Sequence, residues 1–204
     1  MPSTKAHATS VSRIERSTEG DVAGGRPTIL LLLGLTGAGK STLGRRLARE
    51  KRELYFSIDE WLKKLFWMDA PSQDPLPWVL ERCRRVDTLI ASLLEQEIAG
   101  GRGAVLDLGF SKPAERKRWI DFAEARGAAV ALLMLDVPRE ERWARVEKRN
   151  LSLGPTDVAV DRATFDWMEG YFEPPTDEEL RYLVMAGGGD SYVLASDERD
   201  SQTE

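Results

Sequence analysis

The sequence predicts an α/β fold in which helices cover both faces of a mostly parallel sheet. Short apolar runs alternate along the chain with longer segments of helical period, a pattern typical of such folds. The 204 residues suffice for one domain with a sizeable core, and a second full domain is not expected. Apolar residues make up 42% of the chain and charged residues 31%, which excludes a disordered, collagenous or disulfide-rich protein.

Five apolar runs are the strand candidates, at residues 28–33, 53–58, 104–108, 129–135 and 180–185. Between them lie segments of helical spacing, at residues 40–50, 60–67, 78–99, 113–126, 139–149 and 158–171. The third of these helices has the clearest apolar stripe, and Gly100 with Gly101 supplies its C-terminal stop. Pro113 and Pro138 stand where prolines open a helix.

The ends of the chain differ in composition from its middle. Residues 1–27 are rich in Ser, Thr and Gly and predict a flexible extension, residues 28–186 form the predicted domain, and residues 187–204 predict a loose acidic tail with a weak strand at 192–194. The longest uncharged apolar run, residues 128–135, is far too short to cross a bilayer, and no secretory signal is recognisable. We therefore expect no membrane partner and a cytoplasmic location.

Charge and rare residues narrow the chemistry further. The 29 Lys and Arg against 34 Asp and Glu give a net charge of -5, which disfavours a globally basic nucleic-acid binder but leaves a local basic groove open. The single cysteine, Cys83, and the single histidine, His7, argue against an internal disulfide, a cysteine or histidine metal site, and histidine acid–base catalysis.

The strongest motif is GLTGAGKS at residues 34–41, which matches a phosphate-binding loop between a strand and a helix. Glycines let the backbone approach phosphate oxygens with its N–H groups, and the following helix adds the positive end of its dipole. In such a loop Lys40 contacts the β and γ phosphates, and the Ser41 hydroxyl binds Mg²⁺. The predicted nucleotide-binding residues are Gly34, Thr36, Gly37, Ala38, Gly39, Lys40, Ser41 and Thr42.

Two aspartates follow neighbouring strand candidates. Asp107 ends an apolar run, the position of an acid that holds Mg²⁺ or its water beside the loop; alternatively it only caps the strand end. Asp59 follows residues 55–58 and is a candidate general base for an acceptor hydroxyl. Asp59 could also be the N-cap of a helix starting at Glu60, and the two roles are compatible.

Three arginines are spaced to share one helix face. Arg142, Arg145 and Arg149 lie three and then four residues apart, so the face they form could neutralise charge on a transferred phosphoryl group. The alternative is a solvated face on which Glu141 pairs with Arg145. The stretch at residues 150–156 contains Gly and Pro and could hinge a lid.

Together these motifs resemble the small P-loop kinases that include zeta toxins, chloramphenicol phosphotransferase and the kinase domain of polynucleotide kinase. The residues that carry the resemblance are GLTGAGKST at 34–42, SID at 57–59, VLD at 105–107, RWARVEKR at 142–149 and FEPP at 172–175, and it spans about residues 28 to 180. It implies a P-loop NTPase fold with a five-stranded parallel sheet of order 2-3-1-4-5 and a small helical lid, ATP with Mg²⁺, Asp59 as the base, and lid arginines at Arg145 and Arg149.

The acceptor is the least determined part of this prediction. Polynucleotide-kinase-like members tend to carry an arginine three residues after the aspartate that matches Asp59. This chain has Leu62 there, and the difference disfavours a nucleic-acid acceptor. The resemblance places the acceptor pocket in the segment after the second strand, where six aromatic residues occur that could equally be core. They are Tyr55, Phe56, Trp61, Phe66, Trp67 and Trp78.

These observations predict an ATP-dependent kinase that phosphorylates a hydroxyl of a small-molecule acceptor. A polynucleotide 5′-hydroxyl kinase is a second hypothesis, although Asp69 and Asp74 oppose the basic track that a nucleic acid needs. A third is a regulatory ATP-binding or ATPase module without an acceptor. Oligomeric state is not indicated by the sequence.

Overall fold

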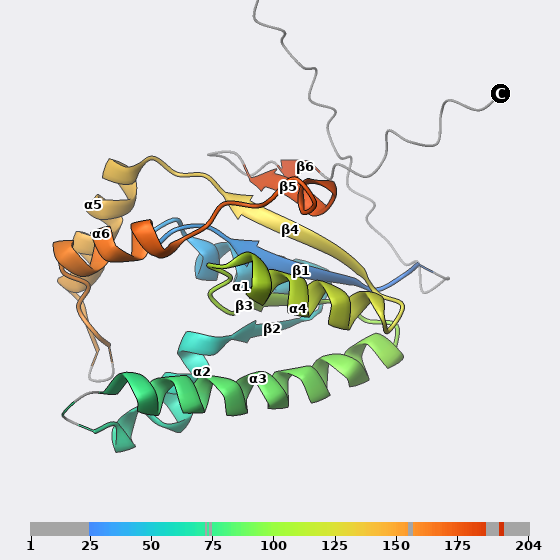
Figure 1. The fold of residues 1–204 in the computed structure, drawn as a ribbon, viewed down its shortest axis with the longest axis horizontal. Coiled ribbons are helices and arrows are strands. Elements are labelled where there is room, and N and C mark those ends of the chain that lie inside the picture. Colours follow the sequence, from blue (N-terminus) through green and yellow to red (C-terminus); the bar gives the residue numbers. More distant parts are fainter. Residues whose placement is uncertain (1–24, 72, 74, 155–156, 187–191, 194–204) are drawn as a thin grey trace, which may run out of the picture.

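The computed structural model describes residues 25–71, 73, 75–154, 157–186 and 192–193. Within these residues the strands form one sheet of order β2-β3-β1-β4-β5-β6 (Figure 1). The strands are β1 (Thr28–Leu33), β2 (Leu54–Ser57), β3 (Ala104–Asp107), β4 (Ala129–Leu135), β5 (Leu183–Ala186) and β6 (Tyr192–Val193). The first five are parallel, which confirms the predicted order 2-3-1-4-5, and the short β6 pairs antiparallel with β5 at the edge.

The helices follow the predicted alternation, with several boundaries shifted by a few residues. Within the described residues they are α1 (Lys40–Lys51), α2 (Ile58–Leu65), α3 (Pro75–Ala99), α4 (Pro113–Glu124), α5 (Arg139–Asn150) and α6 (Arg162–Tyr171). The helix expected at 60–67 begins earlier, because the Ser57 side chain accepts a hydrogen bond from the Glu60 amide and caps it. The helix expected at 158–171 begins only after Asp161, whose carboxylate caps it in the same way. The strand expected at 180–185 starts after a 3₁₀ turn at Leu180–Tyr182.

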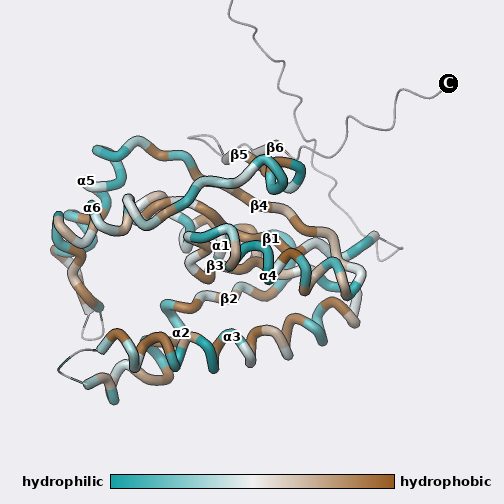
Figure 2. Tube along the Cα trace, in the orientation of Figure 1, coloured by the Kyte–Doolittle hydropathy of each residue, from teal (hydrophilic) through white to brown (hydrophobic). Residues whose placement is uncertain are grey.

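The core lies on both faces of the sheet, because successive side chains of a strand point to opposite sides. Ile29 and Leu31 of β1 pack with buried residues of α3 and α4 on one face. Leu30 and Leu32 pack with buried residues of α1 on the other. The central strands are therefore apolar throughout their length, as the brown strands of Figure 2 show.

Helices α5 and α6 lie beyond the carboxyl ends of β1 and β4 (Figure 1). They have a small core of their own, formed by Val146, Val160 and Phe165 with Trp143 packed against it. The Asn150 side chain fastens the connection between them, because it donates to the Val160 carbonyl at 2.8 Å and accepts from the Val160 amide at 3.2 Å. The two helices thus form a unit at the edge where the parallel strands end.

The predicted extension and tail fall mostly outside the described residues, at 1–24, 187–191 and 194–204, so the proposed domain boundaries stay predictions. Among the helices of the described part, none combines the length and the apolar character needed to cross a bilayer.

Candidate active site

The predicted phosphate loop joins β1 to α1 at the carboxyl edge of the sheet. Gly37 and Gly39 have φ values of +83° and +97°, backbone angles that residues with a Cβ rarely adopt. Gly39 is also the N-cap of α1, so the first free amides of this helix face the loop. The backbone is therefore shaped to present N–H groups to an anion, as the motif predicts.

Lys40 folds back over this loop. Its ammonium donates to the Gly34 carbonyl at 2.7 Å and to the Leu35 carbonyl at 3.4 Å. Burial lowers the pKa of Lys40, and the negative charges of Asp107 and Asp59 oppose that shift. The cation thus contacts the loop and lies near both the predicted metal ligand Asp107 and the predicted base Asp59.

Asp107 ends β3 and receives two hydroxyl groups. Its Oδ2 accepts from the Ser41 Oγ at 2.8 Å and from the Tyr55 hydroxyl at 2.8 Å, while its side chain is buried. Ser41 and Asp107, the two predicted ligands of Mg²⁺, are therefore adjacent. Hard oxygen atoms of this kind are the ligands that Mg²⁺ accepts in nucleotide sites, so the pair fits the ion.

Tyr55 belongs to this cluster, whereas the sequence placed it among the aromatic residues of the acceptor pocket. Its ring occupies space beside α1 that exists because residue 44 is glycine; a Cβ there would lie 2.6 Å from the Tyr55 Cε2. Burial, together with the neighbouring Asp107 charge, raises the pKa of Tyr55, so the phenol stays a donor at neutral pH. The sequence did contain a signal for this role. Tyr55 and Ser57 are two residues apart on β2, so they lie on the same face of the sheet, next to the strand that ends in Asp107.

Asp59 lies in the first turn of α2. The alternative that Asp59 caps a helix starting at Glu60 is wrong, because Ser57 is the cap. Burial and the nearby Asp107 raise the pKa of Asp59, and the positive charges of Lys40, Lys63 and Arg149 act in the opposite direction. Asp59 is therefore not engaged as a helix cap and lies among the charges of Asp107 and Lys40.

One cavity of about 300 Å³ brings these groups together, with Lys40, Asp59 and Asp107 in its lining. Its other walls come from the end of β1, the phosphate loop, the loop after β3 and α6. These lining residues are Leu32, Leu33, Gly34, Leu35, Thr36, Gly109, Phe110, Ser111, Trp167, Met168, Tyr171 and Phe172. The loop after β3 and the aromatic side of α6 were not predicted as parts of the site.

The aromatic residues expected around the acceptor lie elsewhere. None of the six, which run from Tyr55 in β2 to Trp78 in α3 and all lie within the described residues, lines this cavity. Phe56 is buried in the core, and Trp61 and Phe66 pack against the same core. The packing alternative accounts for these three, and the aromatic wall of the cavity is supplied instead by α6 and the residues next to it.

Two of the three lid arginines approach the loop, with different surroundings. Arg145 donates to the Ala38 carbonyl at 3.2 Å, so it contacts the phosphate loop. It also forms the alternative ion pair with Glu141, at 2.5 Å, while its role toward a phosphoryl group stays a prediction. Arg142 is buried, donates to the Thr36 and Val137 carbonyls, and pairs with Glu169 of α6 at 2.6 Å. The charge of the third arginine, Arg149, acts on Asp59.

Arg116, another residue that the sequence did not single out, holds together two segments that border the cavity. It is fully buried and pairs with Glu179 through Nε and Nη2 at 2.7 and 2.8 Å. It also donates to the carbonyls of Phe110, Glu173 and Pro174, which fixes the loop after β3 against the segment after α6. The available signal was its place on the apolar face of α4, since Trp119 and Ile120 follow it at helical spacing and are buried.

Comparisons with known proteins agree with this architecture. The chain superposes on Kti12 of Chaetomium thermophilum in complex with ADP-AlF3 with a TM-score of 0.59 and 16% identity, over 81% of this chain and 91% of that one. A sugar kinase from Janibacter sp. HTCC2649 matches with a TM-score of 0.52 and 17% identity, over 79% and 85%. A chain of the Pnkp1/Rnl/Hen1 RNA repair complex matches with a TM-score of 0.54 and 18% identity, over 76% of this chain and 49% of that one.

At these identities the solved structures establish the fold and leave the acceptor open. The resemblance to small P-loop kinases is confirmed, and this fold implies nucleotide binding. A family model described as an AAA domain matches residues 29–175, which include the phosphate loop, both aspartates and the lid arginines. The chain therefore belongs to this AAA domain family and has the fold of a P-loop kinase.

Proposed function

We propose that the protein is an ATP-dependent kinase that transfers the γ-phosphoryl group to a hydroxyl of a small-molecule acceptor. The observation that carries this proposal is the single cavity in which Lys40, Asp59 and Asp107 meet the phosphate loop. A nucleotide-binding module without an acceptor has no need of a second carboxylate that lines the same cavity as the metal ligand. Phosphoryl transfer needs one, because the acceptor hydroxyl must lose its proton.

The nucleotide phosphates would lie on the amides of the loop and the start of α1, with the Lys40 ammonium on the terminal phosphates. Lys40 would exchange its hydrogen bonds to the Gly34 and Leu35 carbonyls for phosphate oxygens. Ser41 and Asp107 would hold Mg²⁺, which when bound neutralises charge on the phosphates.

The proposed transfer is one substitution at phosphorus. The acceptor oxygen forms a bond to the γ-phosphorus as the bond to the ADP oxygen breaks, and the hydroxyl proton passes to the Asp59 carboxylate. The raised pKa of Asp59 suits this role, since a base works best when its pKa approaches the working pH.

The lid arginines divide into two kinds in this proposal. Arg145 and Arg149 would stabilise negative charge on the transferred group, a role supported by the contact of Arg145 with the loop and by the effect of the Arg149 charge on Asp59. Arg142 is better described as a positioning residue, because its donors are engaged by Thr36, Val137 and Glu169.

A mass-spectrometric acceptor screen tests the proposal. Protein, ATP and Mg²⁺ are incubated with sugars, antibiotics, other metabolites and oligonucleotides, and products are detected by a gain of about 80 Da, the mass of HPO₃. Asp59→Asn should lower kcat by about 10² to 10⁴ with nucleotide affinity kept. Lys40→Ala should abolish the signal, and Asp69→Asn, an exposed acid outside the cavity, is the control.

Three outcomes contradict parts of the proposal. Full activity of Asp59→Asn on the identified acceptor would remove Asp59 as the base. A product found only on oligonucleotides would favour the polynucleotide kinase hypothesis. ATP turnover that no acceptor stimulates or redirects would favour a regulatory ATPase.

A further inference from the structure

The cavity has a feature that phosphate chemistry alone does not explain, a pair of exposed aromatic rings on α6. Trp167 is 63% exposed and Tyr171 is 42% exposed. Their rings are stacked, with centroids 5.2 Å apart and planes 17° apart. Both residues line the same cavity as Lys40 and Asp59. Large aromatic rings left in contact with water beside reactive groups are typical of a ligand-binding surface.

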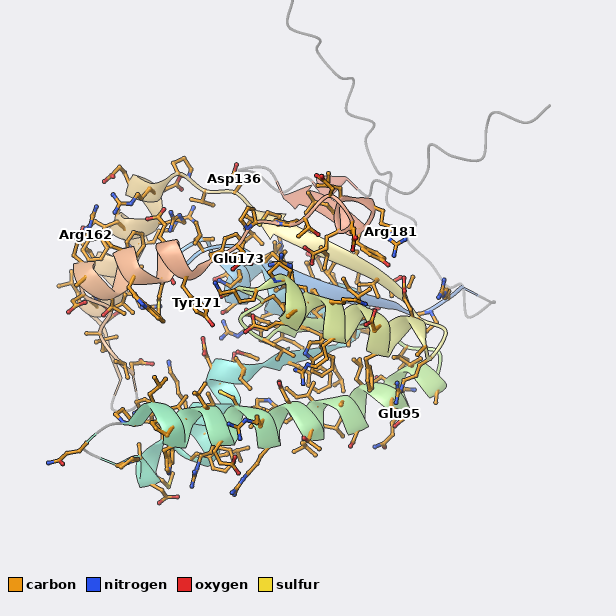
Figure 3. All side chains as sticks on the ribbon, viewed as in Figure 1. Glu95, Asp136, Arg162, Tyr171, Glu173 and Arg181 are labelled. Carbon is orange, nitrogen blue, oxygen red and sulfur yellow. The ribbon has the colours of Figure 1, made fainter. Side chains whose placement is uncertain are left out.

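The pair is held in place by neighbours on the rim. The Lys112 ammonium lies 4.1 Å from the centroid of the Tyr171 ring and pairs with Glu173 at 3.0 Å. Figure 3 shows Tyr171 and Glu173 close to one another near the end of α6. The Tyr171 ring is therefore contacted both by the Lys112 ammonium and by the Trp167 indole, and these contacts restrict its orientation. Tyr171 in turn supports Trp167, which presents a flat apolar surface to the cavity.

The charges of the cavity limit what can lie against this surface. Its charged lining residues are two acids, Asp59 and Asp107, and one base, Lys40, which the nucleotide phosphates would occupy. The nearby Lys63 and Lys112 are already paired with Asp157 and Glu173, and the proposed function assigns Arg145 and Arg149 to the transferred phosphoryl group. A phosphorylated acceptor or a nucleic-acid strand would therefore meet carboxylates with few cations left to offset them. The cavity favours a neutral acceptor.

The remaining lining favours a ring that carries hydroxyls. An indole face is electron-rich and attracts the C–H groups on the flat side of a sugar ring, while hydroxyls on its edge need hydrogen-bonding partners. Ser111, the backbone of Gly109 and Asp59 provide such partners within the same cavity. A volume of about 300 Å³ suffices for one ring beside the phosphoryl group.

We infer that Trp167, supported by Tyr171, is the platform on which a neutral monosaccharide or cyclic polyol stacks as the phosphoryl acceptor. This inference rests on the proposed function and deepens it, because it names the acceptor class and the residue that selects it. Trp167 and Tyr171 are specificity determinants, and Asp59 remains the base.

The test compares acceptor classes and variants in one assay. ADP formation is followed with neutral sugars and cyclic polyols, sugar phosphates, nucleosides and an oligonucleotide. Neutral sugars should be phosphorylated, and Trp167→Ala should raise the KM for the sugar at least tenfold while the KM for ATP stays within about twofold. Trp167→Phe should recover part of the loss, and Met68→Ala, an exposed apolar residue outside the cavity, should change neither constant.

A binding experiment separates failure of this inference from failure of the proposed function. Calorimetric titration of the ADP-bound protein with the same neutral sugars does not depend on phosphoryl transfer, and it should detect binding that Trp167→Ala weakens. If no acceptor is phosphorylated but sugars bind through Trp167, the kinase proposal fails and the platform stands. If nucleosides or phosphorylated compounds are the substrates, if Trp167→Ala changes only the KM for ATP, or if sugars neither bind nor react, the platform is overturned.

Discussion

Asp107 illustrates how single residues define this site, because two hydroxyl groups converge on one of its oxygens. Ser41 is expected to exchange this hydrogen bond for a bond to Mg²⁺ when the nucleotide enters, whereas Tyr55 can keep its own. The tyrosine therefore orients the carboxylate without binding the metal, a role in which outer partners commonly tune metal affinity.

Replacement of Tyr55 tests this role. Tyr55→Phe keeps the ring that fills the space beside Gly44 and removes only the hydroxyl, so the fold should persist. The Mg²⁺ concentration for half-maximal activity should rise about tenfold, at the low end of outer-partner effects. Tyr182→Phe, which also loses a hydrogen bond to a carboxylate, that of Glu124, is the control. An unchanged Mg²⁺ requirement would assign Tyr55 to packing alone.

The pH dependence of activity tests the environment of Asp59. Since burial and Asp107 raise its pKa, the acidic limb of kcat/KM should lie above the ordinary value of 3.8, and activity should rise as pH increases through it. Lys63→Met removes a positive charge that holds this pKa down, so the limb should move to higher pH. Lys64→Met is the matched control, because Lys64 pairs with Glu60 and is mostly exposed. A limb that moves to lower pH in Lys63→Met would contradict the assignment.

At the scale of the elements, α5 packs closely against the phosphate loop. An added Cβ at Gly37 would lie 2.4 Å from the Arg142 carbonyl oxygen, so the first turn of α5 rests directly on the loop. Arg142 and Arg145 reinforce this contact through the Thr36 and Ala38 carbonyls. The lid helix and the loop therefore set each other's position.

Two glycine substitutions separate this contact from backbone strain. Gly37→Ala meets both a positive φ and the α5 backbone, whereas Gly101→Ala meets a positive φ of 72° in open space. Gly101→Ala should cost about 1 to 2 kcal/mol of the free energy of unfolding and leave ADP affinity unchanged. Gly37→Ala should cost more and weaken ADP binding at least tenfold, measured by urea unfolding and calorimetry. Equal effects of the two variants would show that the contact with α5 is unimportant.

Sequence patterns predicted the elements well where local rules decide and poorly where distant contacts decide. The strand at Thr28–Leu33 and the loop after it follow from an apolar run and a motif, and both appear as predicted. Ser57, rather than Asp59, caps α2, a choice between two good capping residues that spacing could not make. Trp167 and Tyr171 belong to the site because α6 lies next to the end of β1, a tertiary arrangement that no local sequence pattern predicts.

At the scale of the whole molecule, nucleotide binding should stabilise the fold, because the loop joins the central strand to α1 and contacts the lid. With ATP and Mg²⁺ at about 100 times their dissociation constant, the free energy of unfolding should rise by about 2.7 kcal/mol. For a chain of this size that corresponds to roughly 5 to 11 °C in Tm. Differential scanning fluorimetry measures the shift. Lys40→Ala should lose most of it, and a wild type without any shift would contradict the nucleotide site.

The Arg116 pair also sets the order in which the cavity can form. Arg116 reaches Glu179 and the Glu173 and Pro174 carbonyls across about 60 residues of chain. In a chain synthesised from its N-terminus, the Phe110 loop must therefore wait for that segment before Arg116 can anchor it. The acceptor side of the cavity cannot be complete until Glu179 has left the ribosome.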